Sequence, residues 1–186
     1  MPILSKEPDI FPDDLFSSPA INTHGDWWVL YTKSRCEKSL CRRLRKFEVP
    51  HFAPMIKRST QSASGRYRES FVPLFPGYVF VLATEQQRYQ ALSTNCVSRC
   101  LPVPDSVQLV HDLHQIQKLV QSDVPLTPEE RIEPGSRVRI RSGSLMGLEG
   151  FVQHRRGQRR LVVAIEFLHQ GASVLIEDWQ LEDLGS

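Results

Sequence analysis

The sequence predicts an α+β protein with two folded parts: a mixed sheet with helices on one face, and then a small five-stranded β-barrel. Strand-like and helix-like segments alternate over residues 26–122 in the order β-α-β-β-α-β-α, which is typical of an α+β sandwich. Residues 134–186 then hold five short strand patterns separated by glycines, which favours a barrel that closes without exposed edges. We interpret residues 123–133 between them as a linker, because they carry prolines and acids without an apolar period.

Residues 1–25 contain four prolines and scattered acids without an apolar period, so we expect a disordered extension. This start lacks the basic and apolar regions of a signal peptide, which favours a cytoplasmic location with reduced thiols. The four cysteines are Cys36, Cys41, Cys96 and Cys100. Their spacing lacks the paired C-x2-C pattern of a zinc site, so we expect no metal and no cofactor.

The first strand and helix of the sandwich follow this extension. Residues 27–32 have the aromatic and β-branched content of a strand. Ser34 and Glu37 fit a capping box, in which each side chain satisfies a free amide at the helix start. The apolar face of the predicted helix consists of Cys36, Leu40, Leu44 and Phe47. Pro50 ends this helix.

The remaining elements of the first part are a strand at 51–56, a polar hairpin loop at 59–65, a return strand at 67–81, a helix at 85–93, a strand at 97–103 and a helix at 108–120. The apolar run within the return strand is too short for a bilayer, which takes roughly 20 residues, and prolines interrupt it. We therefore expect no membrane association. Phe75 and Tyr78 flank a Pro-Gly turn in this run, and the pair fits either a contact surface or a buried strand end.

Basic residues are concentrated in one section of the chain. Residues 33–68 hold eleven Lys and Arg against two acids, whereas the whole chain has a formal net charge of +2. Such an excess indicates a polyanionic partner or, alternatively, a solvated helix face. The cations that could follow a nucleic-acid backbone are Arg42, Arg43, Arg45, Lys46, Lys57, Arg58, Arg66 and Arg68. Contacts of this kind would depend on salt and not on base sequence.

Two motifs resemble those of a known family. Residues 73–81, Pro-Leu-Phe-Pro-Gly-Tyr-Val-Phe-Val, resemble the central motif of the N-terminal (NGN) domain of the NusG and RfaH transcription elongation factors. Residues 135–152, in which Gly143, Gly147 and Gly150 follow Gly135, resemble a KOW motif. Three further features occur in the same order as in the family: the tryptophan strand, the S-x-x-E helix start and the Ala53-Pro54 strand. The resemblance thus covers residues 26–184 and implies an NGN domain at 26–122 and a KOW barrel at 134–186.

The resemblance implies a transcription elongation and antitermination factor that makes and breaks no bond, and we accordingly expect no enzyme activity. In the family, the N-terminal domain docks on the clamp helices of RNA polymerase through an apolar depression, bridges the channel and reduces pausing. The matching residues here are Phe75, Pro76, Tyr78, Trp27, Trp28 and Tyr31. The KOW domain is implied to recruit a small-subunit ribosomal protein or the termination factor Rho, with contacts around Phe151 and residues 165–167. We expect a monomer.

The sequence also departs from the family pattern. In RfaH-type proteins a His/Thr cluster after the central motif contacts the opposite jaw, but residues 86–90 here read Gln-Gln-Arg-Tyr-Gln. The acidic extension and residues 52–56 favour a specialised RfaH-like paralogue, which could also contact the non-template DNA strand. Alternation over residues 161–167 favours strands over the helical hairpin that RfaH can form. The alternative function is an RNA- or ribosome-binding KOW module, although residues 133–186 carry seven basic and seven acidic side chains and so no net charge.

Overall fold

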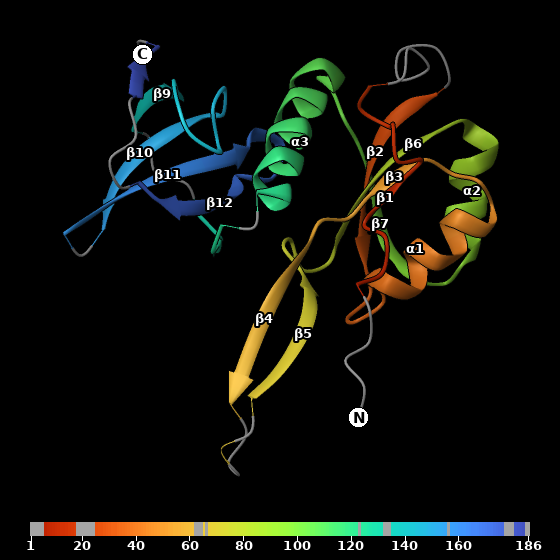
Figure 1. Ribbon diagram of the computed structural model, residues 1–186. Helices are drawn as coiled ribbons and strands as arrows, with labels where there is room; N and C mark the ends of the chain where they lie inside the picture. The colour runs from red at the N-terminus through yellow and green to blue at the C-terminus, as the bar shows by residue number, and fades with distance from the viewer. Residues whose placement is uncertain are drawn as a thin grey trace. The chain divides into compact units, whose positions relative to one another are not determined.

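The computed structural model describes residues 6–17, 25–61, 65, 67–122, 124–131, 135–155, 157–176 and 181–184. The chain forms two compact units, Met1–Ser106 and Val107–Ser186. The described residues contain three α-helices and thirteen strands, which confirms the predicted α+β class (Figure 1). No helix among these described segments is long and apolar enough to cross a membrane.

The first unit is built on a five-stranded sheet with the order β1-β3-β6-β2-β7. Its strands are β1 (Ile10–Phe11), β2 (Asp26–Thr32), β3 (His51–Phe52), β6 (Tyr78–Ala83) and β7 (Val97–Pro102). Every pairing described in this sheet is antiparallel, so the sheet is not mixed as predicted. The reason is that β6 inserts between β2 and β3 and runs antiparallel to both, which splits the expected parallel β-α-β pair.

Helices α1 (Glu37–Lys46) and α2 (Glu85–Ser93) lie against this sheet (Figure 1). The core between α1 and the sheet includes Leu40 and Leu44 from α1 and Leu30, Val79 and Val81 from the strands. The predicted bounds of α2 are confirmed. A capping box begins α2: the Thr84 hydroxyl accepts from the Gln87 amide while the Gln87 side chain accepts from the Thr84 amide.

The capping box predicted for α1 is wrong. Cys36 is the residue before the helix, and it makes no side-chain cap. Ser34 precedes a left-handed residue, Arg35 (φ 60°), which turns the chain before the helix begins. The Glu37 carboxylate instead accepts a hydrogen bond from the Gly77 amide at 2.8 Å, and Glu37 is only 8% exposed. This acid therefore ties the start of α1 to the turn before β6.

A two-stranded hairpin, β4 (Met55–Gln61) and β5 (Tyr67–Pro73), projects from the first unit (Figure 1). Its register runs from Met55 opposite Pro73 to Gln61 opposite Tyr67. The predicted polar loop is therefore shorter than residues 59–65, because pairing continues to Gln61. Cross-strand pairing in such a ribbon satisfies the backbone even where the side chains are polar and exposed.

Residues 6–17 are ordered, although the sequence predicted a disordered extension. Ile10–Phe11 form β1, which pairs with β3 at the edge of the sheet. Leu15 is 2% exposed, and the ring of Phe16 stacks on Trp27 with centroids 6.3 Å apart. Ile10, Phe11, Leu15 and Phe16 thus supply apolar surface that is buried against the unit. The prolines and acids around them hid this pattern in the sequence. The rest of the predicted extension lies outside the described residues.

The second unit contains α3 (Ser106–Gln121), β8 (Thr127–Glu129), β9 (Ser136–Ile140), β10 (Glu149–Arg155), β11 (Gln158–Ile165), the 3-10 turn η2 (Glu166–Leu168), β12 (Gln170–Leu175) and β13 (Leu181–Asp183). Its antiparallel sheet has the order β13-β9-β10-β11-β12-β8. Strands at four of the five predicted places are confirmed, the predicted last strand lies partly outside the described residues, and the described residues 149–155 and 158–165 form strands and not helices. Phe167 belongs to η2 instead of the preceding strand. Among the described residues the sheet is open, so closure into a barrel stays a prediction.

Two segments before residue 134 are attached to this second sheet. Asp112 of α3 accepts a hydrogen bond from the Glu166 amide at 3.0 Å, and Gln115 accepts from the Glu149 amide at 3.4 Å. Strand β8 lies inside the predicted linker and pairs with β12. The compact units therefore divide before α3, whereas the sequence-based boundary lies after it.

Candidate functional site

The predicted Pro-Gly turn joins β5 to β6 and is tightly held. The Tyr78 amide donates to the Phe75 carbonyl at 3.1 Å, and Gly77 has φ 85°, a left-handed torsion that glycine adopts without strain. A Cβ atom at Gly77 would lie 3.0 Å from the Tyr31 ring. The Gly77 carbonyl accepts from the Thr32 amide at 2.7 Å. The Gly77 amide donates to the Glu37 carboxylate, so both the amide and the carbonyl of Gly77 are held by hydrogen bonds.

Beside the turn, two tyrosines of adjacent strands form a partly exposed pair. Tyr31 lies directly opposite Tyr78 in the sheet, with ring centroids 5.2 Å apart and planes inclined by 56°. Tyr31 is 40% exposed, Tyr78 is half-buried and Pro76 is exposed. Rigid aromatic side chains on a fixed turn give a large contact area at low entropic cost.

The other three residues of the predicted docking set lie deeper. Phe75 is 2% exposed and packs edge-on against Phe80 at 6.2 Å. Trp27 is 4% exposed beneath Phe16. Trp28 is half-buried, with the Arg88 guanidinium 4.8 Å from its ring centroid. These three side chains are therefore less accessible, while those of Tyr31, Pro76 and Tyr78 reach the surface.

A cavity of about 520 Å³ opens beside the tyrosine pair. It is lined by Tyr31, Thr32, Ser34, Arg35, Glu37, Lys38, Phe71, Val72, Pro73, Pro76 and Gly77. Its walls are apolar on the side of the hairpin root and cationic at Arg35 and Lys38. Lys38 also donates to the Phe71 carbonyl at 2.7 Å, which joins α1 to β5. Sequence reasoning missed this cavity, since only the pairing of the helix start with the turn brings these residues together.

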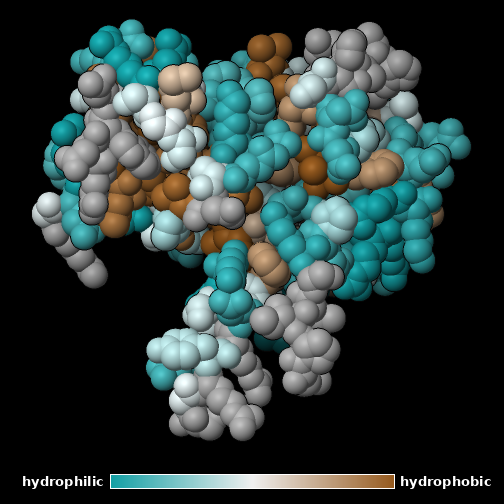
Figure 2. All heavy atoms as spheres, in the orientation of Figure 1, coloured by the Kyte–Doolittle hydropathy of each residue, from teal (hydrophilic) through white to brown (hydrophobic). Residues whose placement is uncertain are grey.

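The predicted nucleic-acid residues of α1 are mostly held by neighbouring groups. Arg43 donates to the Thr94 carbonyl at 2.6 Å, and Arg45 donates to the Pro8 carbonyl at 2.9 Å. Arg42 binds the Glu7 carboxylate. Lys46 is exposed. In Figure 2 the surface over α1 is largely hydrophilic, as these cations require.

The predicted residues of the hairpin lie on its exposed strands. Lys57 pairs with Glu69 across the strands at 2.8 Å, and Arg58 is exposed. Arg66 lies outside the described residues, as does the side chain of Arg68. The hairpin and α1 are linked at the hairpin root through Lys38. The described cations of the predicted set therefore fall into two groups, on one helix and one ribbon of the same unit.

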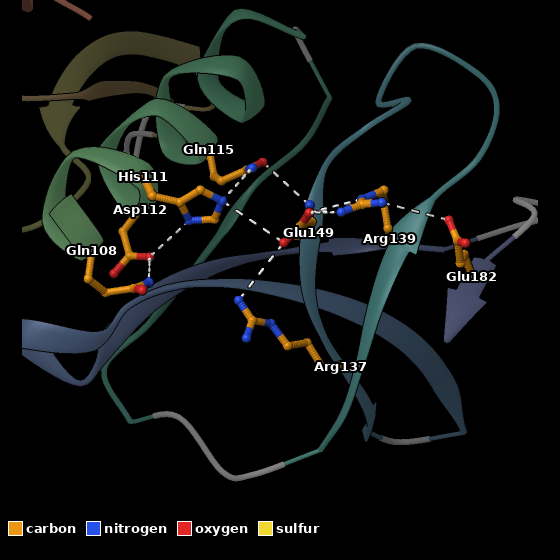
Figure 3. A network of polar contacts seen from close by, with 8 residues as sticks. All are labelled: Gln108, His111, Asp112, Gln115, Arg137, Arg139, Glu149 and Glu182. Atoms are coloured by element: carbon orange, nitrogen blue, oxygen red, sulfur yellow. Dashed lines mark hydrogen bonds and ion pairs between the residues drawn. The ribbon is translucent and has the colours of Figure 1, made fainter. Parts of the chain in front are cut away.

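Strand β9 of the second unit pairs its arginines with acids of the same unit (Figure 3). Glu149 on β10 lies opposite Arg139 of β9. Arg139 donates to it through Nε at 2.9 Å and through Nη2 at 2.6 Å. Glu182 on β13 lies 3.9 Å from Arg139 and 3.5 Å from Arg141. Arg137 lies 3.9 Å from Glu149. The cations of β9 are therefore largely compensated within the sheet.

The same network continues onto α3 (Figure 3). His111 lies 3.6 Å from Asp112 and 3.9 Å from Glu149. Burial raises the pKa of Asp112, although the hydrogen bond from the Glu166 amide acts in the opposite direction. The cavity enclosed here is about 30 Å³, room for roughly one water molecule and no substrate. Within the described residues, no group of three or more His, Cys, Asp or Glu side chains could hold a metal ion.

The first unit thus presents a rigid turn with partly exposed tyrosines on a small α+β fold. A family model described as transcription termination factor nusG matches residues 25–133, which is more than half of the chain. The chain therefore belongs to the NusG family, whose members are non-enzymatic transcription elongation and antitermination factors that bind RNA polymerase. A search of curated proteins found no match. The family match ends before β9.

Proposed function

We propose that this protein is an elongation and antitermination factor that docks on the clamp helices of RNA polymerase through Tyr31, Pro76 and Tyr78. The observation that carries the proposal is the partly exposed tyrosine pair beside the rigid Pro-Gly turn, within the residues that the family model matches. A helix tip fits such a site, because its apolar side chains can enter the adjacent cavity. Bound in this way, in the cytoplasm, the monomeric factor bridges the nucleic-acid channel and reduces pausing.

The proposal includes a contact with the non-template DNA strand through cations of the first unit. It is supported by the two groups of cations on α1 and the hairpin, where carbonyl partners hold Arg43 and Arg45 without cancelling their charge. Such contacts bind phosphates and not bases. The N-terminal segment, which lies outside the family match, supports a specialised RfaH-like role on a subset of operons.

For the second unit we propose a closed KOW barrel that recruits a small-subunit ribosomal protein or Rho. The six antiparallel strands support the barrel. The half-buried side chains of Phe151 and Phe167 support an apolar contact surface. The compensated arginines of β9 disfavour the alternative function, an RNA-binding module, because a paired cation has little charge left for phosphates.

The docking proposal is tested by binding of the full chain to purified bacterial RNA polymerase without nucleic acid. We expect Tyr31→Ala/Tyr78→Ala to weaken binding about tenfold or more, because aromatic anchors dominate such interfaces. Phe47→Ala is the matched control, since Phe47 on the same unit is also 40% exposed. A pause assay with the same variants should show the same order of effects.

Equal polymerase affinity in the tyrosine variant, the control and the wild type would overturn the docking proposal. Tight binding to ribosomal RNA, with no binding to polymerase, would instead support the RNA-binding alternative. Thermal unfolding of each variant shows whether a loss of binding reflects a loss of folding.

A further inference from the structure

The N-terminal segment places a carboxylate on a basic stripe of α1. Glu7 accepts two hydrogen bonds from the Arg42 guanidinium, from Nε at 2.9 Å and from Nη2 at 2.6 Å. The neighbouring Pro8 carbonyl accepts from Arg45 at 2.9 Å. Lys38, Arg42 and Arg45 are spaced by four and three residues, so they share one side of the helix. The segment thus lies along that side.

The segment is anchored, so Glu7 is always close to the stripe. The Asp9 carbonyl accepts from the Ala53 amide at 2.7 Å, and β1 follows immediately in the sheet. Leu15 and Phe16 are packed farther along the segment. A carboxylate attached in this way competes as an intramolecular ligand, whose effective concentration far exceeds that of a free acid.

Glu7 occupies the place that a phosphate would take. The planar guanidinium fork matches a carboxylate and a phosphate with the same two parallel hydrogen bonds. The hydrogen bond from Arg42 lowers the pKa of Glu7, with further contributions from the charges of Lys38 and Arg45. The side chains of Arg42 and Glu7 are 58% and 32% exposed, so solvent and a competing anion can reach the pair.

We propose that Glu7 is an internal competitor of single-stranded nucleic acid, which gains a contact with Arg42 only by displacing this carboxylate. The inference rests on the proposed nucleic-acid contact of the first unit and adds its regulation. While Glu7 is in place, Arg42 contributes little to phosphate binding. When an elongation complex holds the strand nearby, exchange of Glu7 for phosphate adds one contact. The competition therefore lowers the overall affinity for nucleic acid, so that the factor is bound mainly where the local concentration of nucleic acid is high.

The test measures binding of the full chain to a labelled single strand of about 12 thymidines, over roughly 50 to 200 mM salt. We expect Glu7→Gln to bind about fivefold more tightly at the lowest salt. Its plot of log affinity against log salt should be steeper by about 0.7, the value for one more phosphate contact. Asp13→Asn is the matched control, because it removes one exposed negative charge from the same segment without releasing Arg42.

A double-mutant cycle with Arg42→Ala completes the test. Arg42→Ala should weaken binding little in the wild type and several-fold in Glu7→Gln. Equal affinities and slopes for Glu7→Gln and Asp13→Asn would overturn the competition while leaving the nucleic-acid contact intact. Absence of binding by every variant at the lowest salt would overturn both. Glu7→Gln could also unfold at a lower temperature than Asp13→Asn. In that case the competition is judged by the loss of affinity that Arg42→Ala causes in the wild type and in Glu7→Gln, because each comparison is made within one background.

Discussion

Helix α1 of the first unit and strand β9 of the second hold most of their arginines in different ways. On α1, Arg43 and Arg45 donate to backbone carbonyls, which fix the side chains but leave the positive charge in place. On β9, Arg139 faces Glu149 and Glu182, which cancel the charge as well as fixing the side chain. The comparison teaches that a count of cations does not locate a polyanion surface. The identity of each partner decides whether a cation remains available to phosphates.

The largest expected effect concerns the apolar support of the first unit. Phe75→Ala should lower the free energy of unfolding by about 3 to 5 kcal/mol, because the ring is 2% exposed. Pro76→Ala at the neighbouring exposed position should have a much smaller effect. Denaturant unfolding followed by tryptophan fluorescence measures both. Similar losses for the two variants would contradict the separation between the supporting residues and the surface residues.

The next prediction contrasts the buried titratable groups of the two units. Burial lowers the pKa of His51 from 6.5 to about 4, while its ring nitrogen Nδ1 lies 2.8 Å from the Val49 carbonyl. Between these values the unfolded chain binds more protons than the folded chain, so stability falls by about 3 kcal/mol as the pH drops from 6.5 to 4. The raised pKa of Asp112 has the opposite sign and favours the second unit at low pH.

Hydrogen exchange, read separately for β6 and β11, measures this contrast. His51→Gln should remove the drop in protection of β6 over that pH range. His154→Gln, at an exposed position of β10, controls for the loss of one imidazole. An unchanged drop in the His51 variant would show that another group is responsible.

A smaller effect is expected when exposed cations are removed from each unit in turn. Lys46→Ala/Arg58→Ala in the first unit should reduce the salt slope of single-strand binding by about 1.4, the value for two phosphate contacts. Arg139→Ala/Arg141→Ala in the second unit removes the same charge and should leave the slope unchanged. If both double variants lower the slope equally, the distinction between the units fails.

The smallest effect comes from making the second unit resemble the first. Glu149→Gln/Glu182→Gln leaves the arginines of β9 without their acids, and we expect nucleic-acid affinity to rise about twofold. Because the pairs with Glu182 are exposed, its single replacement should shift the midpoint of thermal unfolding by no more than about 2 °C. Unchanged affinity in the double variant would mean that the pairing does not mask these cations.

Much of the fold follows from local patterns in the sequence. The helix at 85–93 and the strands of the second unit were predictable because their apolar spacing and turn residues act over a few residues. The antiparallel order of the first sheet was not, since it depends on β6 entering between β2 and β3. Nor was β1, because two strand residues pair only where a preformed edge is present.

The candidate site was predictable in position and less so in its details. The motif at 73–81 identified the turn, but not that Phe75 points into the core while Tyr78 reaches the surface. Phe75 lies in the turn between β5 and β6, where strand alternation does not set the direction of a side chain, so the geometry of the turn decides it. Glu37 was read as a helix cap because local spacing fits that role, whereas a distant amide from Gly77 takes its carboxylate.

The β4–β5 hairpin extends the first unit well beyond its central sheet (Figure 1). Seven paired residues, at about 3.3 Å each, extend roughly 23 Å from the sheet. That length is nearly twice the about 12 Å width of the major groove of B-DNA. The ribbon is attached to the rest of the unit at its root, where Lys38 of α1 donates to the Phe71 carbonyl. Under the proposed nucleic-acid contact, it would therefore present Lys57 and Arg58 to phosphates away from the sheet and not on its surface.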